Sequence, residues 1–448
     1  MKKASCCLLP SKPIETQIMP IQVYLNPARE QWPELLTRPT MDLAEIEQRV
    51  APVMEAVRVE GDQALRRFTI QFDSVKLDNL KVPEEAIARA GDQLSGELKA
   101  AIQVARDNIY AFHSAQREPE QRIETMPGVT CWRRSVAIQK VGLYIPGGTA
   151  PLFSTLLMLG TPAKIAGCKQ IVLCTPPGPD GLPHPAILYA AQLVGVTEVF
   201  RVGGGQAIAA MGYGTESVPA VDKIFGPGNQ YVTAAKQLLA KGGLPIDMPA
   251  GPSEVAVIAD DSADPAFIAA DLLSQAEHGV DSQVILLTTH KALVEQVQAE
   301  VESQLQQLPR QEIARKSIAN SRAFVLSDME EVVNMANEYA AEHLIIATDD
   351  AGRVAEGIVN AGSIFLGHYS PESVGDYASG TNHTLPTNGW ARSYSGVSLD
   401  SFVKKITFQS LTAAGLQTIG PVVEQMAAAE QLEAHKQAVS IRLKKLQS

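Results

Sequence analysis

The chain has 448 residues, 45% of them hydrophobic, which is enough for two or more domains with sizeable cores. Its 38 lysine and arginine residues against 49 aspartate and glutamate residues give a formal net charge of −11. No basic run interleaves with aromatic residues, and no apolar run approaches the roughly 20 residues that a membrane span needs. These patterns exclude nucleic acid and membrane as expected partners. Because no targeting segment is visible, we expect a cytoplasmic protein.

The first 135 residues contain no clear alternation of strands and helices. Residues 1–40 are interpreted as an N-terminal extension. From 41 to 135 apolar residues recur mainly at helical spacing, which predicts a helical segment packing on the main body. We predict a surface position for His113 in this segment.

Short apolar runs alternate with helical patterns from about residue 136 to residue 368. The first series predicts strands at 141–145, 170–174, 198–202 and 223–225. The second predicts strands at 255–259, 283–288, 323–326, 344–347 and 363–366. Such alternation is typical of βαβ units and a mostly parallel sheet. We therefore predict an α/β protein with two tandem, doubly wound, Rossmann-like domains, 136–250 and 251–368, and small helical extensions at both ends.

The last segment, 369–448, loses this pattern. It begins with a span rich in glycine, serine, threonine and asparagine, and loops of that length are usually functional. An Ala-rich amphipathic helix is predicted from Pro421 to Leu446, and it carries Glu430 and His435.

Gln275 and His278 stand three apart at the end of an apolar helical pattern, directly before Gly279. On a helix they share one face and can reach a single point. They are candidates for metal binding or proton transfer, although a polar helix cap explains the same pattern.

Two further places combine polar residues with irregular structure. Gly203-Gly-Gly205 follows a predicted strand and precedes a helix, as a phosphate-binding turn does. However, Ile208 replaces the third glycine of the dinucleotide fingerprint, so a tight strand-to-helix turn that binds no nucleotide is the alternative interpretation. Glu342 and His343 stand at a helix-to-strand junction, where an acid/base pair or a solvated histidine fits. Asp376 and His383 lie in the long loop. No two histidines have zincin spacing, so a metal site must combine distant segments.

Several stretches together resemble the histidinol dehydrogenase family over roughly residues 40–440. They are Val141-Gly-Leu-Tyr-Ile-Pro-Gly-Gly148, Val202-Gly-Gly-Gly-Gln-Ala-Ile208, Val221-Asp-Lys-Ile-Phe-Gly-Pro-Gly-Asn229, Ala250-Gly-Pro-Ser-Glu254, Ser274-Gln-Ala-Glu-His-Gly279, Ala341-Glu-His-Leu344 and Val374-Gly-Asp-Tyr-Ala-Ser-Gly-Thr-Asn-His-Thr-Leu-Pro-Thr387. Gly205 departs from the alanine that is common in the family.

The resemblance implies an aldehyde-dehydrogenase-like fold and a zinc- and NAD-dependent, four-electron oxidation of L-histidinol through L-histidinal to L-histidine. It implies one zinc ion per subunit, held by Gln275, His278, Asp376 and His435. It makes Glu342 and His343 the catalytic pair. The substrate would contact Ser253, Gln275, His278, His343, Asp376, His383, Glu430 and His435, and NAD would contact Tyr144, Gln206 and Asn229.

The resemblance also implies a homodimer in which the C-terminal helix, within 369–448, reaches the partner's site. It assigns NAD to the first α/β domain and the metal to the second. Two other functions stay open from the residues alone. A zinc hydrolase of a small amino-acid-like substrate would use the same ligands without NAD, and a thiol-dependent aldehyde dehydrogenase would need Cys131 or Cys174 as its nucleophile.

Overall fold

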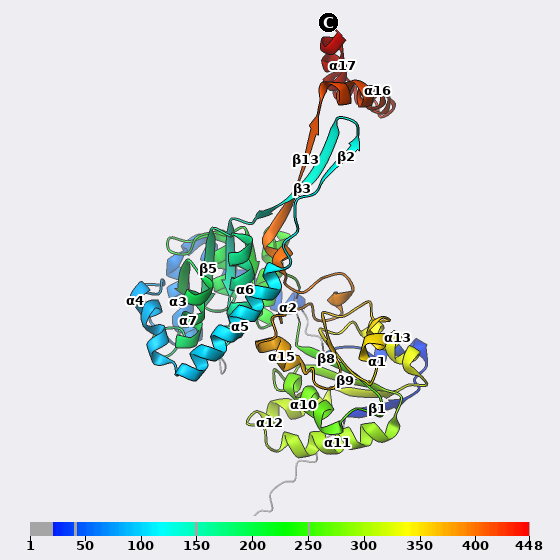
Figure 1. Ribbon diagram of the computed structural model, residues 1–448. Helices are drawn as coiled ribbons and strands as arrows, with labels where there is room; N and C mark the ends of the chain where they lie inside the picture. The colour runs from blue at the N-terminus through cyan, green and yellow to red at the C-terminus, as the bar shows by residue number, and fades with distance from the viewer. Residues whose placement is uncertain (1–20, 40–42, 148–150, 250, 448) are drawn as a thin grey trace, which may run out of the picture. The chain divides into compact units, whose positions relative to one another are not determined.

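The computed structural model describes residues 21–39, 43–147, 151–249 and 251–447 (Figure 1). They fall into two compact units, and each is considered by itself. Unit 1 takes its described residues from 1–41, 250–374 and 385–395, and unit 2 takes them from 42–249, 375–384 and 396–448. Each unit contains a parallel sheet with a hydrophobic core on both faces. The predicted pair of doubly wound α/β sheets is therefore confirmed. Residues 1–20 of the predicted extension lie outside the described residues.

The parallel sheet of unit 2 has the strand order β6-β5-β4-β7. Its strands are β4 (Lys140–Tyr144), β5 (Gln170–Thr175), β6 (Glu198–Arg201) and β7 (Lys223–Phe225). Counted along the chain, this order is 3-2-1-4, the Rossmann order, which reverses between β4 and β7. Successive residues of each strand face opposite cores, as Val172 and Leu173 do.

Helices cover both faces of this sheet. One face packs against α2 (Leu43–Glu60), α3 (Asp62–Asp73), α8 (Gly204–Tyr213) and α9 (Gln230–Lys241). The other packs against α5 (Gly96–Ser114), α6 (Phe153–Ala166) and α7 (Pro185–Val194), with the short α4 (Glu84–Arg89) beside α7. The surface position predicted for His113 is wrong. The ring is fully buried because His113 continues the buried stripe of Ile102, Ala105 and Ile109 along α5.

Unit 1 repeats the same strand order with additions at both edges, β1-β10-β9-β8-β11-β12. Its strands are β1 (Gln22–Leu25), β8 (Glu254–Ala259), β9 (Gln283–Thr288), β10 (Arg322–Val325), β11 (His343–Ala347) and β12 (Ser363–Leu366). One face packs against α10 (Pro265–Ala276), α11 (Lys291–Leu305) and α12 (Gln311–Ala319). The other packs against α1 (Trp32–Leu35), α13 (Met329–Tyr339) and α14 (Ala351–Ala355). Part of the segment predicted to be an extension thus forms the edge strand β1.

Unit 2 also holds an antiparallel sheet and two terminal helices. They are β2 (Arg122–Met126), β3 (Val129–Ala137), β13 (Val403–Leu411), α16 (Ala413–Ala429) and α17 (Glu433–Gln447). The helical prediction for 41–135 is wrong at β2 and β3, because β3 is held by pairing with the distant β13. The single helix predicted from Pro421 is also wrong. Pro421 lies inside α16, and the helical path is interrupted at Gln431, whose φ is +59°.

Residues 369–398 contain the short helix α15 (Glu372–Tyr377), one turn of 3-10 helix (Trp390–Arg392) and otherwise no regular structure. Within the parts of the chain that the structure describes, no helix combines the length and apolar character that a membrane crossing requires.

Candidate active site

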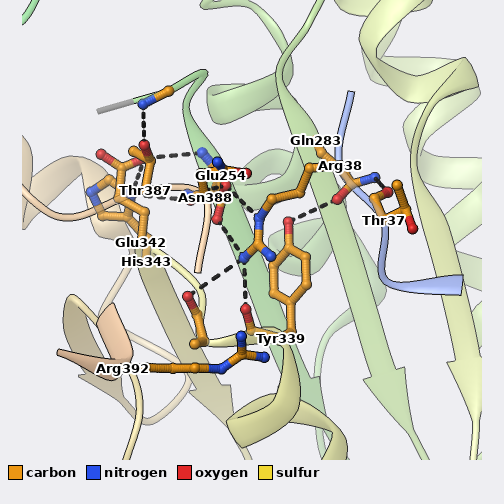
Figure 2. A network of polar contacts seen from close by, with 12 residues as sticks. Thr37, Arg38, Glu254, Gln283, Tyr339, Glu342, His343, Thr387, Asn388 and Arg392 are labelled. Atoms are coloured by element: carbon orange, nitrogen blue, oxygen red, sulfur yellow. Dashed lines mark hydrogen bonds and ion pairs between the residues drawn. The ribbon is translucent and has the colours of Figure 1, made fainter. Parts of the chain in front are cut away.

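Glu342 and His343 are both buried at the beginning of β11, next to the beginning of β8 (Figure 2). Side chains of adjacent strand residues point to opposite faces, yet both of these reach the same residue of β8. The amide nitrogen of Glu254 donates to Glu342 Oε2 at 2.9 Å, and Glu254 O lies 3.2 Å from His343 Nδ1. The junction before β11 is irregular, with Ala340 at φ +52°. The structure therefore places the acid and the imidazole together.

The contact with Glu254 O also determines which ring nitrogen of His343 is basic. A carbonyl oxygen only accepts hydrogen bonds, so Nδ1 carries the hydrogen and Nε2 is the nitrogen that can take up a proton. Gln275 Nε2 lies 3.5 Å from the same Nδ1, but both nitrogens carry hydrogen in this tautomer, so this contact is not a hydrogen bond. The pair is thus arranged for proton transfer through Nε2.

The side chain of Glu254 is the centre of a buried polar network (Figure 2). Arg38 binds it with two parallel contacts, Nε to Oε1 at 2.6 Å and Nη2 to Oε2 at 2.9 Å. The amide nitrogen of Asn388 donates to Oε1 at 2.6 Å. Burial raises the pKa of Glu254 above its ordinary value, and Arg38 opposes that shift. The network therefore fixes the residue whose peptide groups hold Glu342 and His343.

Tyr339 links this network to the sheet. The Arg38 guanidinium lies 3.9 Å from the centre of the Tyr339 ring and donates to its carbonyl oxygen at 2.6 Å. The Tyr339 hydroxyl donates to Gln283 Oε1 at 3.0 Å, and Gln283 Nε2 donates to the carbonyl of Thr37 at 3.2 Å. Burial raises the pKa of Tyr339 well above its ordinary range. Arg38 and Glu254 are functional residues that the sequence reasoning missed, although Glu254 lies in one of the recognised motifs.

The structure places the predicted metal ligands in three groups. Gln275 is buried in the last turn of α10, and His278 follows it as an exposed residue beyond the helix end. Asp376 lies in α15 and His383 in the loop that follows it; His383 Nδ1 lies 3.0 Å from the Asp376 carbonyl oxygen, and Nε2 lies 2.8 Å from Thr155 Oγ1. His435 is exposed near the start of α17. Among the described residues, no three His, Cys, Asp or Glu side chains gather closely enough to hold a metal.

The remaining substrate candidates accompany these groups. Ser253 directly precedes β8, and its carbonyl accepts from the amide of Gln283 at 3.2 Å. Glu430 is the exposed C-terminal cap of α16, at the same turn as His435.

The predicted NAD residues Tyr144, Gln206 and Asn229 line one cavity of about 1340 Å³ in unit 2. The Tyr144 hydroxyl accepts from the Gly204 amide at 3.0 Å, and burial raises its pKa to about 12. Asn229 caps α9, with Oδ1 accepting from the amide of Tyr231 at 3.1 Å. All three residues lie at or just beyond the carboxyl ends of strands, where open α/β sheets bind ligands.

The glycine turn before α8 closes this cavity. Gly204 has a φ of +61° and opens the helix, and Gly204, Gly205 and Gln206 line the cavity, so the amino end of α8 lies at its wall. A Cβ at Gly203 would lie 2.6 Å from Pro176 Cγ, whereas a Cβ at Gly205 meets its nearest atoms at 3.6 Å. An alanine at the position of Gly205, as in the family, is therefore compatible with this turn.

The thiol candidates do not fit a nucleophile. Cys174 is fully buried in β5, and burial raises the pKa of its thiol far above the ordinary value. Cys131 lies in β3 of the antiparallel sheet and is not among the residues that line the cavity.

A Rossmann-ordered sheet with a dinucleotide-sized cavity, together with a second sheet that buries an acid and an imidazole, is the architecture of a nucleotide-dependent oxidoreductase. Comparison with known proteins makes this class specific. A family model described as histidinol dehydrogenase matches residues 36–443. A histidinol dehydrogenase from Bacteroides thetaiotaomicron is 60% identical over 420 residues, covering 94% of this chain and 98% of that protein.

Two other relatives agree. A histidinol dehydrogenase from Vibrio parahaemolyticus is 52% identical over 427 residues, covering 95% of this chain and 98% of its own length. The crystal structure of histidinol dehydrogenase from Elizabethkingia anophelis matches with a TM-score of 0.93 and 55% identity, covering 96% of this chain and 99% of that one. The chain belongs to the histidinol dehydrogenase family, a family of NAD-dependent oxidoreductases.

Proposed function

We propose that this protein oxidises L-histidinol through L-histidinal to L-histidine with two molecules of NAD, and that one zinc ion per subunit holds the substrate. The observation that carries the proposal is the buried pair Glu342 and His343, both bound to the peptide groups of Glu254. Membership of the histidinol dehydrogenase family supports the substrate and the place in histidine biosynthesis. A cytoplasmic location stays a prediction.

Gln275 fits the role of a zinc ligand. Its Oε1 is buried and accepts no hydrogen bond from any residue that the structure describes. A buried polar atom without a partner costs about 1–3 kcal/mol, so it calls for a ligand. With His278, Asp376 and His435 the set would contain one carboxylate, which leaves net positive charge on zinc. When bound, the ion supplies a fixed charge that grips the amino and imidazole nitrogens of histidinol.

His343 and Glu342 divide the proton transfers. His343 Nε2 takes the proton of the substrate hydroxyl while the carbinol carbon gives a hydride to the nicotinamide of NAD. Glu342 would then take a proton from the water that adds to the aldehyde. The hydrate would give its hydride to a second NAD and release a proton, which leaves the carboxyl group of L-histidine. The hydrogen bond from Glu254 leaves one carboxylate oxygen of Glu342 for that water. Ser253, His383 and Glu430 would orient the substrate.

Tyr144, Gln206 and Asn229 would hold NAD in the cavity of unit 2. The amide groups at the start of α8 would meet the pyrophosphate. The cavity exceeds the usual range of pockets for small ligands, as a dinucleotide requires.

One experiment tests the reaction directly. Metal content is measured, and NAD reduction on addition of histidinol is followed before and after chelation. We expect about one zinc per subunit, two NAD reduced per histidinol, and loss of turnover with the metal. A protein that binds zinc but reduces no NAD would point instead to the zinc hydrolase.

The homodimer is part of the proposal. Glu430 and His435 lie exposed at the turn between α16 and α17. The same two helices expose the large apolar side chains Val422, Met426 and Ile441. A second subunit that covers this surface would receive Glu430 and His435 in its own active site.

Mixed dimers test this exchange. The activity measured is the formation of L-histidine. Glu342→Gln should block the aldehyde step and His435→Ala the binding of zinc, so neither variant alone completes the four-electron oxidation. If the residues come from different subunits, mixing and reassociation restores about a quarter of wild-type activity, because half of the dimers are mixed and each has one intact site. If both residues act within one subunit, the mixture stays inactive, and the proposed exchange is wrong. A monomer with full activity contradicts it as well.

A further inference from the structure

Asp73 is an ionisable residue of the cofactor cavity that the proposed reaction does not use. It is the last residue of α3 and lines the cavity together with Tyr144, Gln206 and Asn229. Its Oδ2 is buried and accepts no hydrogen bond from any residue that the structure describes. A buried carboxylate oxygen in this condition needs a donor that the described residues do not supply, such as a bound ligand.

A comparison of the carboxylates at the two ends of α3 shows how unusual the unpaired Asp73 is. Asp62 begins the helix, where the positive end of the dipole favours a carboxylate. Although burial raises its pKa, hydrogen bonds from Ser217 and Thr215 lower it below the ordinary value. Asp73 ends the helix, where the dipole disfavours negative charge, and burial raises its pKa to about 6. Helix stability alone therefore does not explain a carboxylate at this position.

The other ionisable side chains that line the cavity have partners within the described residues. They are Arg49, Tyr144, Asp180, His184 and Tyr231. The Arg49 guanidinium lies 2.5 Å from Glu45 and also interacts with Tyr231. Asp180 Oδ1 accepts from the Leu182 amide at 3.0 Å, and His184 Nδ1 accepts from the Ala186 amide at 3.1 Å. Asp73 is thus the acceptor that a ligand's hydroxyl groups can use.

The position of α3 indicates which part of NAD meets Asp73. The nicotinamide must approach the substrate, and the loop of His383 is held on α6 through Thr155. Helix α6 covers one face of the sheet, whereas α3 covers the opposite face. The end of the dinucleotide that lies toward α3 is therefore the adenosine end.

We propose that Asp73 accepts hydrogen bonds from the 2′- and 3′-hydroxyls of the adenosine ribose of NAD and excludes NADP by repelling its 2′-phosphate. The inference rests on the proposed binding of NAD in this cavity. A carboxylate on the ribose diol is a general means by which Rossmann-type sites select NAD. Arg49, the lining residue with a charge that would attract a 2′-phosphate, is paired with Glu45.

The test compares Asp73→Asn with the wild type, using kcat and KM for NAD and NADP. We expect KM for NAD to rise about tenfold because charge-assisted hydrogen bonds are lost. We expect KM for NADP to fall and kcat with NAD to stay within about twofold. Asp78→Asn is the matched control, since it removes the same charge from an exposed residue outside the cavity lining. Asp73→Ser serves as a second variant.

Binding of 5′-AMP and 2′,5′-ADP separates this inference from the proposed reaction, because it requires no turnover. The wild type should prefer 5′-AMP, and Asp73→Asn should lose or reverse that preference. Wild-type protein that reduces NAD while Asp73→Asn keeps the same preference overturns the role of Asp73 alone. Wild-type protein that reduces no NAD but shows the expected preference overturns the reaction alone. A shift of the preference in Asp180→Asn, and not in Asp73→Asn, places the ribose elsewhere and also contradicts the inference.

Discussion

The two parallel sheets share one strand order, yet they carry their polar groups at opposite ends. In unit 2, Tyr144, Gln206 and Asn229 lie at or beyond the carboxyl ends of the strands, around the reversal between β4 and β7. In unit 1 the reversal falls between β8 and β11. There Glu342 and His343 stand at the amino ends, against the first residue of β8. Open α/β sheets bind ligands at the carboxyl ends of their strands, so the cavity of the first sheet follows that rule and the position of this pair does not.

The helix ends at these two edges explain the difference. Carboxyl ends of strands adjoin helix N-termini, such as that of α8, where the first amides lack acceptors within the helix and suit a phosphate. Amino ends adjoin helix C-termini, where the negative end of the dipole suits a cation. Gln275 lies in the last turn of α10, and α13 ends shortly before Glu342. One topology therefore offers an end that suits an anion and an end that suits a cation, and under the proposed function the chain would use one on each sheet.

Glu342→Gln is the sharpest change at the amino-end site. The amide can still accept from the Glu254 backbone, so the local structure should persist. We expect the oxidation of L-histidinal to fall by about 10³-fold, since the general base for water is lost. The oxidation of L-histidinol should fall less than tenfold, because His343 serves that step. Single-turnover NAD reduction from each substrate measures both, and equal losses would refute the division between the two residues.

Arg38→Met should destabilise unit 1 by about 3–5 kcal/mol, because it leaves the Glu254 carboxylate buried without its partner. Urea unfolding measures the loss. The double variant Arg38→Met/Glu254→Gln removes both charges, and its free energy of unfolding should fall clearly less. If the double variant is as unstable as the single one, the ion pair does not account for the effect, and Arg38 stabilises through packing on Tyr339.

Gly203→Ala tests the carboxyl-end site of the other sheet. Its Cβ would approach Pro176 Cγ to 2.6 Å, so the turn before α8 must shift. Such crowding costs about 1–3 kcal/mol, and we expect KM for NAD to rise about tenfold with kcat little changed. Gly205→Ala is the control, since its Cβ meets nothing closer than 3.6 Å. Similar KM values for the two variants would show that the turn does not shape the cofactor cavity.

Local patterns predicted much of this molecule. The strands at 223–225, 283–288 and 363–366 match the structure because each is a short apolar run with clear boundaries. Strands β1, β3 and β13 were not predicted, because partners far along the chain hold them in place. The site divides in the same way. Motifs singled out Glu342 and His343, whereas Arg38 acts on a residue 216 positions away and leaves no local signal.

Asp73→Asn has the smallest expected effect on stability, and the effect is a gain, whereas most changes of buried residues destabilise a protein. Burial raises the pKa of Asp73 to about 6 from an ordinary 3.8. The folded state therefore favours the protonated form, and ionisation costs stability as the pH rises through about 6. After allowance for partial exposure, Asp73→Asn should stabilise the nucleotide-free protein by about 1 kcal/mol at pH 7.5. The gain should shrink as the pH falls and vanish below about 4.

Urea midpoints of the two proteins at pH 4, 5, 6 and 7.5 measure this difference, with Asp78→Asn as the charge-matched control. Saturating NAD should reverse the order at pH 7.5, because the wild type gains more from a ligand that it binds more tightly. A residue kept for the fold would destabilise when replaced, at every pH and with or without NAD. Stabilisation without NAD and destabilisation with it would instead show that the Asp73 carboxylate serves cofactor binding. The site at the carboxyl ends of the strands would then recognise the ribose of NAD as well as its phosphates.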